Sequence, residues 1–97
     1  MTHFATHLQE DRRLVLLRLL AEMPAYRANS SVLTMALESY GHAATRDQVK
    51  TELHWLQEQL LVSLSDLGPV LVATATERGQ DVASGRAIVP GVKRPGA

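Results

Sequence analysis

The amino-acid sequence predicts a mainly α-helical domain with a small β-hairpin, in the winged helix-turn-helix arrangement. Three observations lead to this fold class. Apolar residues recur at helical spacing in three segments before residue 60, alternate with polar residues after it, and are followed by turn residues and a second strand-like segment. Two helices joined by a short turn and followed by a β-hairpin make this arrangement. A length of 97 residues corresponds to one domain.

The first helix is expected over residues 8–23, because this segment is rich in strong helix formers and Pro24 follows it. Its polar strip is narrow and holds three charged residues: Asp11, Arg18 and Glu22. Apolar residues cover most of the remaining surface, whereas an ordinary surface helix needs an apolar stripe of only about 100°. The helix is therefore either central to the core of one chain or covered on a second side by another subunit. In a homodimer, Val15 and Leu19 would lie in the interface.

The second and third helices are marked by their N-terminal signals. Residues 29–31 offer small side chains that cap free backbone N–H groups before a helix over residues 32–40. Thr45 and Gln48 fit the capping-box spacing, so a third helix is expected over residues 45–59. Its buried stripe combines apolar residues at spacings of four, three and four with one tryptophan: Val49, Leu53, Leu56, Leu60 and Trp55.

A β-hairpin is expected after the third helix. The segment "LVSLSD" alternates apolar and polar residues, "DLGP" supplies turn residues, and "VLVATAT" returns as an antiparallel strand. Hairpins that enter a minor groove generally present arginine or lysine, but this turn has an acidic residue and no basic one. We therefore expect the hairpin to complete the core rather than to contact DNA bases.

The chain is expected to end in a short helix and a tail. Thr74 and Glu77 repeat the capping-box spacing before a helix that Gly85 can terminate. We assign residues 1–85 to the winged-helix domain and residues 86–97 to an extended, flexible basic tail. The basic residues of this tail are Arg86, Lys93 and Arg94. They would either contact phosphates or a partner protein, or form a plain solubilising tail.

The third helix is the candidate recognition helix. Its polar face presents five residues suited to the major groove: Arg46, Gln48, Lys50, Thr51 and His54. Arginine and lysine pair with guanine, and glutamine pairs with adenine. The segment 45–61 holds two basic and three acidic residues, a sum of 2 − 3 = −1, so it offers few phosphate contacts. The alternative interpretation is a solvated face with charge pairing at i, i+4 spacing.

Composition excludes several other classes of function. Ten basic and ten acidic residues give no overall basic field, and the absence of cysteine removes disulfides and thiolate chemistry. No apolar run approaches the roughly 18 residues of a membrane helix, and no signal peptide is apparent, so a cytoplasmic protein is expected. His3 and His7 lack carboxylate companions for a metal site, and no catalytic motif occurs. We expect no enzyme activity, no cofactor and no bound metal.

Four segments of the sequence resemble a known family: "EDRRLVLLRLLAEMPAYRANSSVL", "ALESYGHAATRDQVKTELHWLQEQLLV", "VLVATATERGQDVA" and "VPGVKRP". They are similar to small uncharacterised proteins of Mu-like phages and prophages, some of which are described as similar to ArsR-type transcriptional regulators. The resemblance covers nearly the whole chain, and "PGVKRP" is its most distinctive part. It implies a winged-helix fold and a phage or prophage origin, and it assigns no biochemical role.

Two departures from the winged-helix regulators matter. Their usual pattern has a glycine between the recognition helix and the first wing strand, whereas Leu60 occupies that place here. Metal-sensing relatives use cysteine thiolates or clustered histidines, and this chain has neither, which argues against metal sensing by that route.

The sequence thus predicts a DNA-binding protein, a transcriptional regulator or DNA-handling factor, that binds double-stranded DNA as a homodimer through helix 45–59. The alternative is a non-enzymatic protein-protein interaction module in phage assembly or host takeover. In that case, the third helix or "PGVKRP" would contact a phage or host protein.

Overall fold

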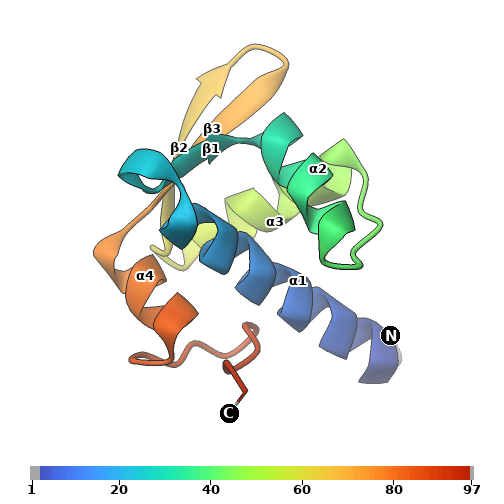
Figure 1. The fold of residues 1–97 in the computed structure, drawn as a ribbon, viewed down its shortest axis with the longest axis vertical. Helices are drawn as coiled ribbons and strands as arrows, with labels where there is room; N and C mark the ends of the chain where they lie inside the picture. Colours follow the sequence, from blue (N-terminus) through green and yellow to red (C-terminus); the bar gives the residue numbers. More distant parts are fainter. Residues whose placement is uncertain (1–2, 97) are drawn as a thin grey trace.

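The computed structural model describes residues 3–96. Its elements, in chain order, are helix α1 (His3–Glu22), a 3-10 turn η1 (Pro24–Tyr26), strand β1 (Arg27–Asn29), α2 (Ser30–Ser39), α3 (Arg46–Glu58), β2 (Val62–Leu67), β3 (Val70–Ala75) and α4 (Glu77–Ser84). Figure 1 shows α1 crossing the middle of the molecule, with the β2–β3 hairpin projecting at the top and α4 at the lower left. The predicted winged helix-turn-helix fold is confirmed.

The hairpin belongs to a three-stranded antiparallel sheet in the order β1-β3-β2. In it β3 lies between the other two strands, with Val62 opposite Ala75 and Leu67 opposite Val70 at the two ends of the β2 register. Strand β1 pairs residues 27–29 with residues 72–74. The sequence did not predict β1, because three residues are too few to show an alternating pattern.

Helix α1 is the central element of the core. Its residues Leu16, Leu17 and Leu20 have no exposed surface, and they belong to one cluster with fully buried leucines of α2 and α3. The apolar coverage noted in the sequence is therefore largely explained within one chain. The helix also begins at His3, five residues earlier than predicted.

The N-terminal caps agree with the sequence in two helices of three. The Asn29 side chain accepts a hydrogen bond from the backbone N–H of Val32 at the start of α2. Thr45 forms the complete predicted capping box at α3. The last helix is present and ends at Gly85 as predicted, but its predicted cap was wrong, because Thr76 rather than Thr74 caps α4 and accepts from the Gly79 N–H. Thr74 is held in the sheet, opposite Ser63 and Arg27.

The end of α3 is a Schellman motif closed by a leucine. The Leu60 N–H donates to the Gln57 carbonyl and the Leu61 N–H to the Leu56 carbonyl, both at 2.9 Å. Leu60 takes the left-handed backbone conformation, with φ of 64°, and its side chain is 70% exposed. This is the position at which winged-helix regulators usually have glycine, so the sequence departure becomes a local backbone strain.

Residues 86–96 are irregular in structure but pack against the helices, which differs from the flexible tail that the sequence predicts. Val89 and Val92 are only 3% and 7% exposed. The Lys93 N–H donates to the Glu10 carbonyl of α1 at 3.2 Å. Burial of two valines overrides the high proline and glycine content on which the flexible-tail prediction relied.

None of the helices formed by residues 3–96 is long and apolar enough to cross a membrane.

Candidate nucleic-acid interface

The exposed face of α3 is the candidate interface, and the opposite side of the helix holds it in the core. Val49, Leu53 and Leu56 have no exposed surface. The outer residues Arg46, Gln48, Thr51 and His54 are exposed, as the sequence predicts for a recognition helix.

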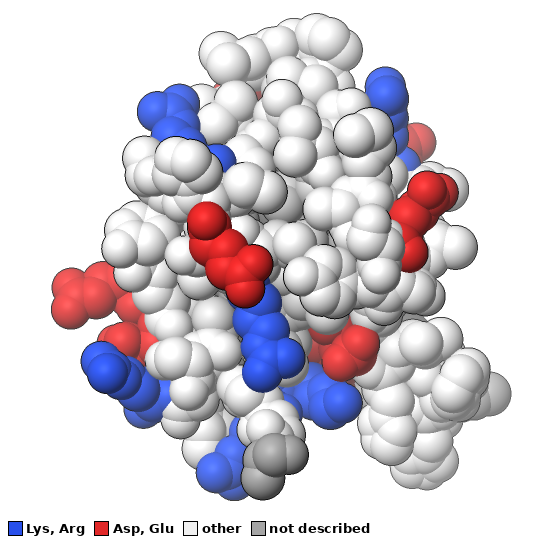
Figure 2. Space-filling view, viewed as in Figure 1, with Lys and Arg blue, Asp and Glu red and all other residues white. Residues whose placement is uncertain are grey.

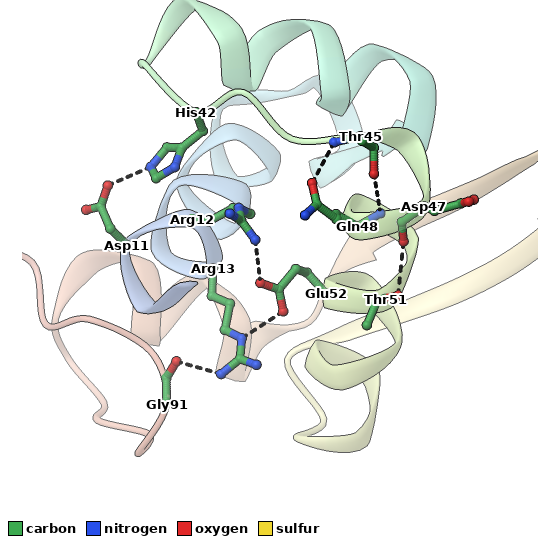
Figure 3. Close-up of polar contacts among 10 residues, drawn as sticks. All are labelled: Asp11, Arg12, Arg13, His42, Thr45, Asp47, Gln48, Thr51, Glu52 and Gly91. Atoms are coloured by element: carbon green, nitrogen blue, oxygen red, sulfur yellow. Dashed lines mark hydrogen bonds and ion pairs between the residues drawn. The ribbon is translucent and has the colours of Figure 1, made fainter. Parts of the chain in front are cut away.

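Two of these polar side chains already have hydrogen-bond partners on α3. Gln48 Oε1 accepts from the Thr45 N–H at 2.9 Å, and Thr51 Oγ1 donates to the Asp47 carbonyl at 3.0 Å (Figure 3). The capping box occupies one lone pair of Gln48 Oε1 and leaves the two side-chain N–H donors to other partners. Arg46 and His54 take part in none of the ion pairs of the described chain, residues 3–96.

Lys50 is placed differently from the other predicted contacts. It is half-buried, and its Nζ donates to the Pro69 carbonyl in the hairpin turn at 2.8 Å. An ammonium group has three donors, so this contact leaves two of them open. Lys50 thus holds the hairpin turn against α3.

Glu52 lies on the inner side of α3 and is 3% exposed. Its carboxylate accepts from Arg13 Nε at 3.0 Å and pairs with Arg12 Nη1 at 3.3 Å, which joins α3 to α1 (Figure 3). This buried pair removes one acidic charge from the outer face. Two basic residues, Arg46 and Lys50, remain there against Asp47 and Glu58, a sum of 2 − 2 = 0 rather than −1.

Arg13 also joins α3 to the C-terminal segment. Its guanidinium lies 3.7 Å from the centre of the Trp55 ring, and its Nη1 donates to the Gly91 carbonyl at 3.0 Å. A Cβ on Gly91 would lie 2.7 Å from the Trp55 ring, and the φ of this residue is 98°, so only glycine fits without strain. Sequence reasoning missed this network, because α1, α3 and residue 91 are far apart in the chain.

A shallow groove of about 270 Å³ lies between α1 and α3. It is lined by residues of both helices: Gln9, Arg12, Asp47, Gln48, Thr51 and Glu52. The groove therefore adjoins two predicted DNA contacts, and Arg12 is its one basic lining residue. The spacing of residues within α3 gives no signal for Gln9 or Arg12, which come from another helix.

The hairpin brings little positive charge to the interface. Strands β2 and β3 with their turn, residues 62–75, contain one charged residue, Asp66, and no basic one. Leu67 at the turn is 60% exposed. In Figure 2, the top centre of the visible face is white, basic groups lie at its upper left and upper right, and acidic and basic groups are interspersed below.

Two basic residues of the C-terminal segment, Lys93 and Arg94, lie beside α1, and Arg86 follows the end of α4. Arg86, Lys93 and Arg94 are exposed. The two carboxylate oxygens of Asp11 have different partners: Oδ1 is 3.5 Å from Lys93 Nζ, and Oδ2 is 2.7 Å from His42 Nε2. One of the three tail cations is thus already paired within the protein.

The histidines are dispersed. His42 lies in the turn after α2 but is only 5% exposed, whereas His3, His7 and His54 are exposed. Residues 3–96 contain no group of three or more histidine and acidic side chains placed to hold a metal ion.

The residues predicted for a dimer interface are mostly covered by their own chain. Val15 is 9% exposed and Leu19 is 6% exposed. Both line a groove of about 220 Å³ that also contains Arg18, Glu22 and Tyr40. The two apolar side chains therefore form part of a surface hollow rather than an exposed apolar ridge.

No protein-family model matches the chain. The chain is 52% identical over 88 residues to the uncharacterised protein gp26 of Escherichia phage Mu, with 91% of each sequence covered. It is 42% identical over 76 residues to an uncharacterised protein of Haemophilus influenzae, covering 77% of this chain and 74% of that protein.

Among solved structures, the chain is similar to a variant of Lactococcus lactis ZitR in the apo form, in which a cysteine and a histidine are replaced. The TM-score is 0.62 and the identity 26%, and the match covers 86% of this chain. The chain spans 58% of the length of that ZitR chain.

Proposed function

The chain belongs to the family of gp26 of Escherichia phage Mu, and we propose that it is a winged-helix DNA-binding protein of a Mu-like phage or prophage. It would act as a transcriptional regulator, of the ArsR type, or as a DNA-handling factor in the cytoplasm, without enzymatic activity. The observation that carries this proposal is the exposed polar face of α3, held at a fixed angle by its core contacts and by the buried Glu52 pair.

In this mechanism α3 enters the major groove. Arg46 and His54 are free to reach base edges or phosphates, and Thr51 and Gln48 lie between them on the outer side of the helix. Lys50 orients the hairpin and keeps two donors for a phosphate. The outer charge of α3 sums to zero, so affinity depends on a few defined contacts rather than on a broad basic surface.

The tail cations Arg86, Lys93 and Arg94 are proposed to add phosphate contacts, with Lys93 contributing least because Asp11 already pairs with it. Lys93 and Arg94 lie beside α1, so we propose that they contact DNA flanking the groove that α3 occupies. The protein is proposed to bind as a homodimer, in which two copies of α3 meet successive major grooves about one helical turn apart.

DNA binding is tested by fluorescence anisotropy of random and phage-derived duplexes at about 50 and about 200 mM salt. Arg46→Ala should weaken binding and reduce the slope of log K against log salt by about one, because each phosphate contact contributes about 0.9 to that slope. Arg78→Ala on α4 removes the same charge from an exposed position outside α3 and serves as the matched control.

Lys50→Ala is measured separately from Arg46→Ala, because it also releases the hairpin from α3. No binding by the wild-type protein at tens of micromolar would refute the DNA proposal. If Arg46→Ala and Arg78→Ala weaken DNA binding equally, α3 is not the DNA-binding surface.

The neutral α3 face and the acidic hairpin favour one alternative, a protein-protein interaction module in phage assembly or host takeover. A protein partner bound through α3 or residues 90–95 would tolerate moderate salt, whereas DNA binding weakens steeply with salt. The two salt concentrations therefore separate the two proposals.

A further inference from the structure

Two hollows flank one ridge on the outer side of α1. The first, of about 220 Å³, is lined by Val15, Leu19 and Tyr40, and the second, of about 170 Å³, by residues of α1 and α4. Arg18 and Glu22 line both hollows and therefore stand between them. Tyr40, at the edge of the first hollow, is 59% exposed.

The ridge carries one charge of each sign, four residues apart. Arg18 and Glu22 are both exposed, and neither takes part in an ion pair within residues 3–96. Four residues correspond to a rise of about 6 Å along a helix. A second α1 running antiparallel, with a two-fold axis near residue 20, would bring Arg18 of each copy opposite Glu22 of the other.

We propose that this face of α1 is the interface with a second copy of the chain, with two reciprocal Arg18–Glu22 ion pairs across the two-fold axis. This deepens the homodimer of the proposed function by naming its surface. The ridge of each copy fits beside the hollows of the other, which is the ridge-into-groove packing of helices. Tyr40 supplies an exposed aromatic ring at the rim, a residue type enriched in protein interfaces.

The charge pattern selects this occupant. A parallel copy would bring like charges together, and a nucleic-acid backbone would be repelled by Glu22. The antiparallel copy satisfies both charges at once. None of the exposed α3 residues Arg46, Thr51 and His54 lines either hollow, so the dimer leaves the candidate DNA face free.

The test uses two charge reversals, Arg18→Glu and Glu22→Arg, measured without DNA by sedimentation equilibrium. Each variant alone places like charges together in both symmetric pairs, which should raise the dimer Kd about ten- to hundredfold. In an equimolar mixture, a heterodimer of the two variants regains both attractive pairs and should form with a Kd near that of the wild type. Far-UV circular dichroism of each variant checks that it remains folded.

The mixture separates the interface from effects inside one helix, because reversing one charge alters the i, i+4 pair of that chain whether or not the other variant is present. Arg46→Glu and Glu58→Arg are the matched control pair, since both lie exposed on α3 outside the two hollows. They should dimerise like the wild type, alone and mixed.

A wild-type protein that is monomeric at tens of micromolar overturns the inference. It is equally overturned if both α1 variants dimerise normally, or if their mixture stays monomeric. Because no DNA is present, these outcomes are independent of whether the protein binds DNA, and loss of DNA binding in the α3 variants leaves this inference intact.

Discussion

The protein should be more stable with glycine at position 60 than with alanine, the reverse of their order inside a helix. Leu60 closes the Schellman motif of α3 with φ of 64°. This conformation brings the Cβ of an L-residue close to the following carbonyl, and glycine has no Cβ. Leu60→Ala removes the side chain but keeps the Cβ, and Leu60→Gly then removes the Cβ alone. The two variants thus isolate the backbone conformation from side-chain packing.

The magnitude follows from two opposing effects. The left-handed conformation costs an L-residue about 1–2 kcal/mol. Glycine also lowers the free energy of unfolding by about 0.4–1 kcal/mol, because it gives the unfolded chain more conformational freedom. The difference favours glycine over alanine by about 0.5–1 kcal/mol, or a rise in Tm of about 4 °C for a domain of this size. Because the Leu60 side chain is 70% exposed, its removal costs less than about 1 kcal/mol.

The assay is urea unfolding of the wild type and both variants, with Tm from calorimetry. Gln57 supplies the control, because it is exposed in the last full turn of α3. There, glycine should be less stable than alanine by about 0.8–1 kcal/mol. If Leu60→Gly is less stable than Leu60→Ala by the same amount as at Gln57, the conformation at position 60 imposes no cost and the reasoning is wrong.

Three further changes probe the contacts that fix α3 and α4. Gly79→Ala should lower the free energy of unfolding by about 2 kcal/mol or more in urea titrations, because its Cβ would lie 2.0 Å from the Leu61 carbonyl oxygen. Gly96→Ala is the control and should be neutral, because no atom lies within 4 Å of its Cβ. Equal stability of the two variants would contradict this steric argument. Glu52→Ala should lower the free energy of unfolding by about 3 kcal/mol, because it leaves the largely buried guanidinium groups of Arg12 and Arg13 without their anion. If chemical unfolding shows a decrease below about 0.5 kcal/mol, the ion pairs are not formed. Thr45→Ala should lower the free energy of unfolding by about 1 kcal/mol, because it removes the cap of α3. Thr74→Ala is the control and should leave the capping of α3 unchanged. Helicity and urea midpoints of the two variants measure the difference.

The sequence was sufficient for those parts of the fold that depend on local spacing. The Thr45 capping box and the alternating strands each involve residues within one element, and both were confirmed. The apolar stripe of α3 was confirmed at Val49, Leu53 and Leu56 but was wrong at Leu60, which lies past the end of the helix and is 70% exposed. The same logic failed at Thr74, because a threonine three residues before a glutamate satisfies the capping pattern equally well from inside a strand. Pairing across the sheet decided between Thr74 and Thr76.

The candidate site was predictable only in part. Which residues of α3 face outward follows from helical periodicity, and Arg46, Gln48, Thr51 and His54 are exposed as expected. Their free hydrogen-bonding capacity does not follow, because it depends on partners elsewhere: Lys50 is bonded to Pro69, 19 positions away. The neutralisation of Glu52 by α1, about 40 positions away, likewise had no local signal.

The contact between Arg13 and Gly91 joins residues 78 positions apart and therefore shapes how the domain folds. Loop-closure entropy grows with chain separation, so the β2–β3 hairpin and the α2–α3 unit close at lower entropic cost than this contact does. We therefore expect residues 86–96 to attach late, after α1 and α3 have met. We also expect the same segment to detach first under mild denaturant, so that the amide of Lys93 should exchange its hydrogen sooner than those of β3.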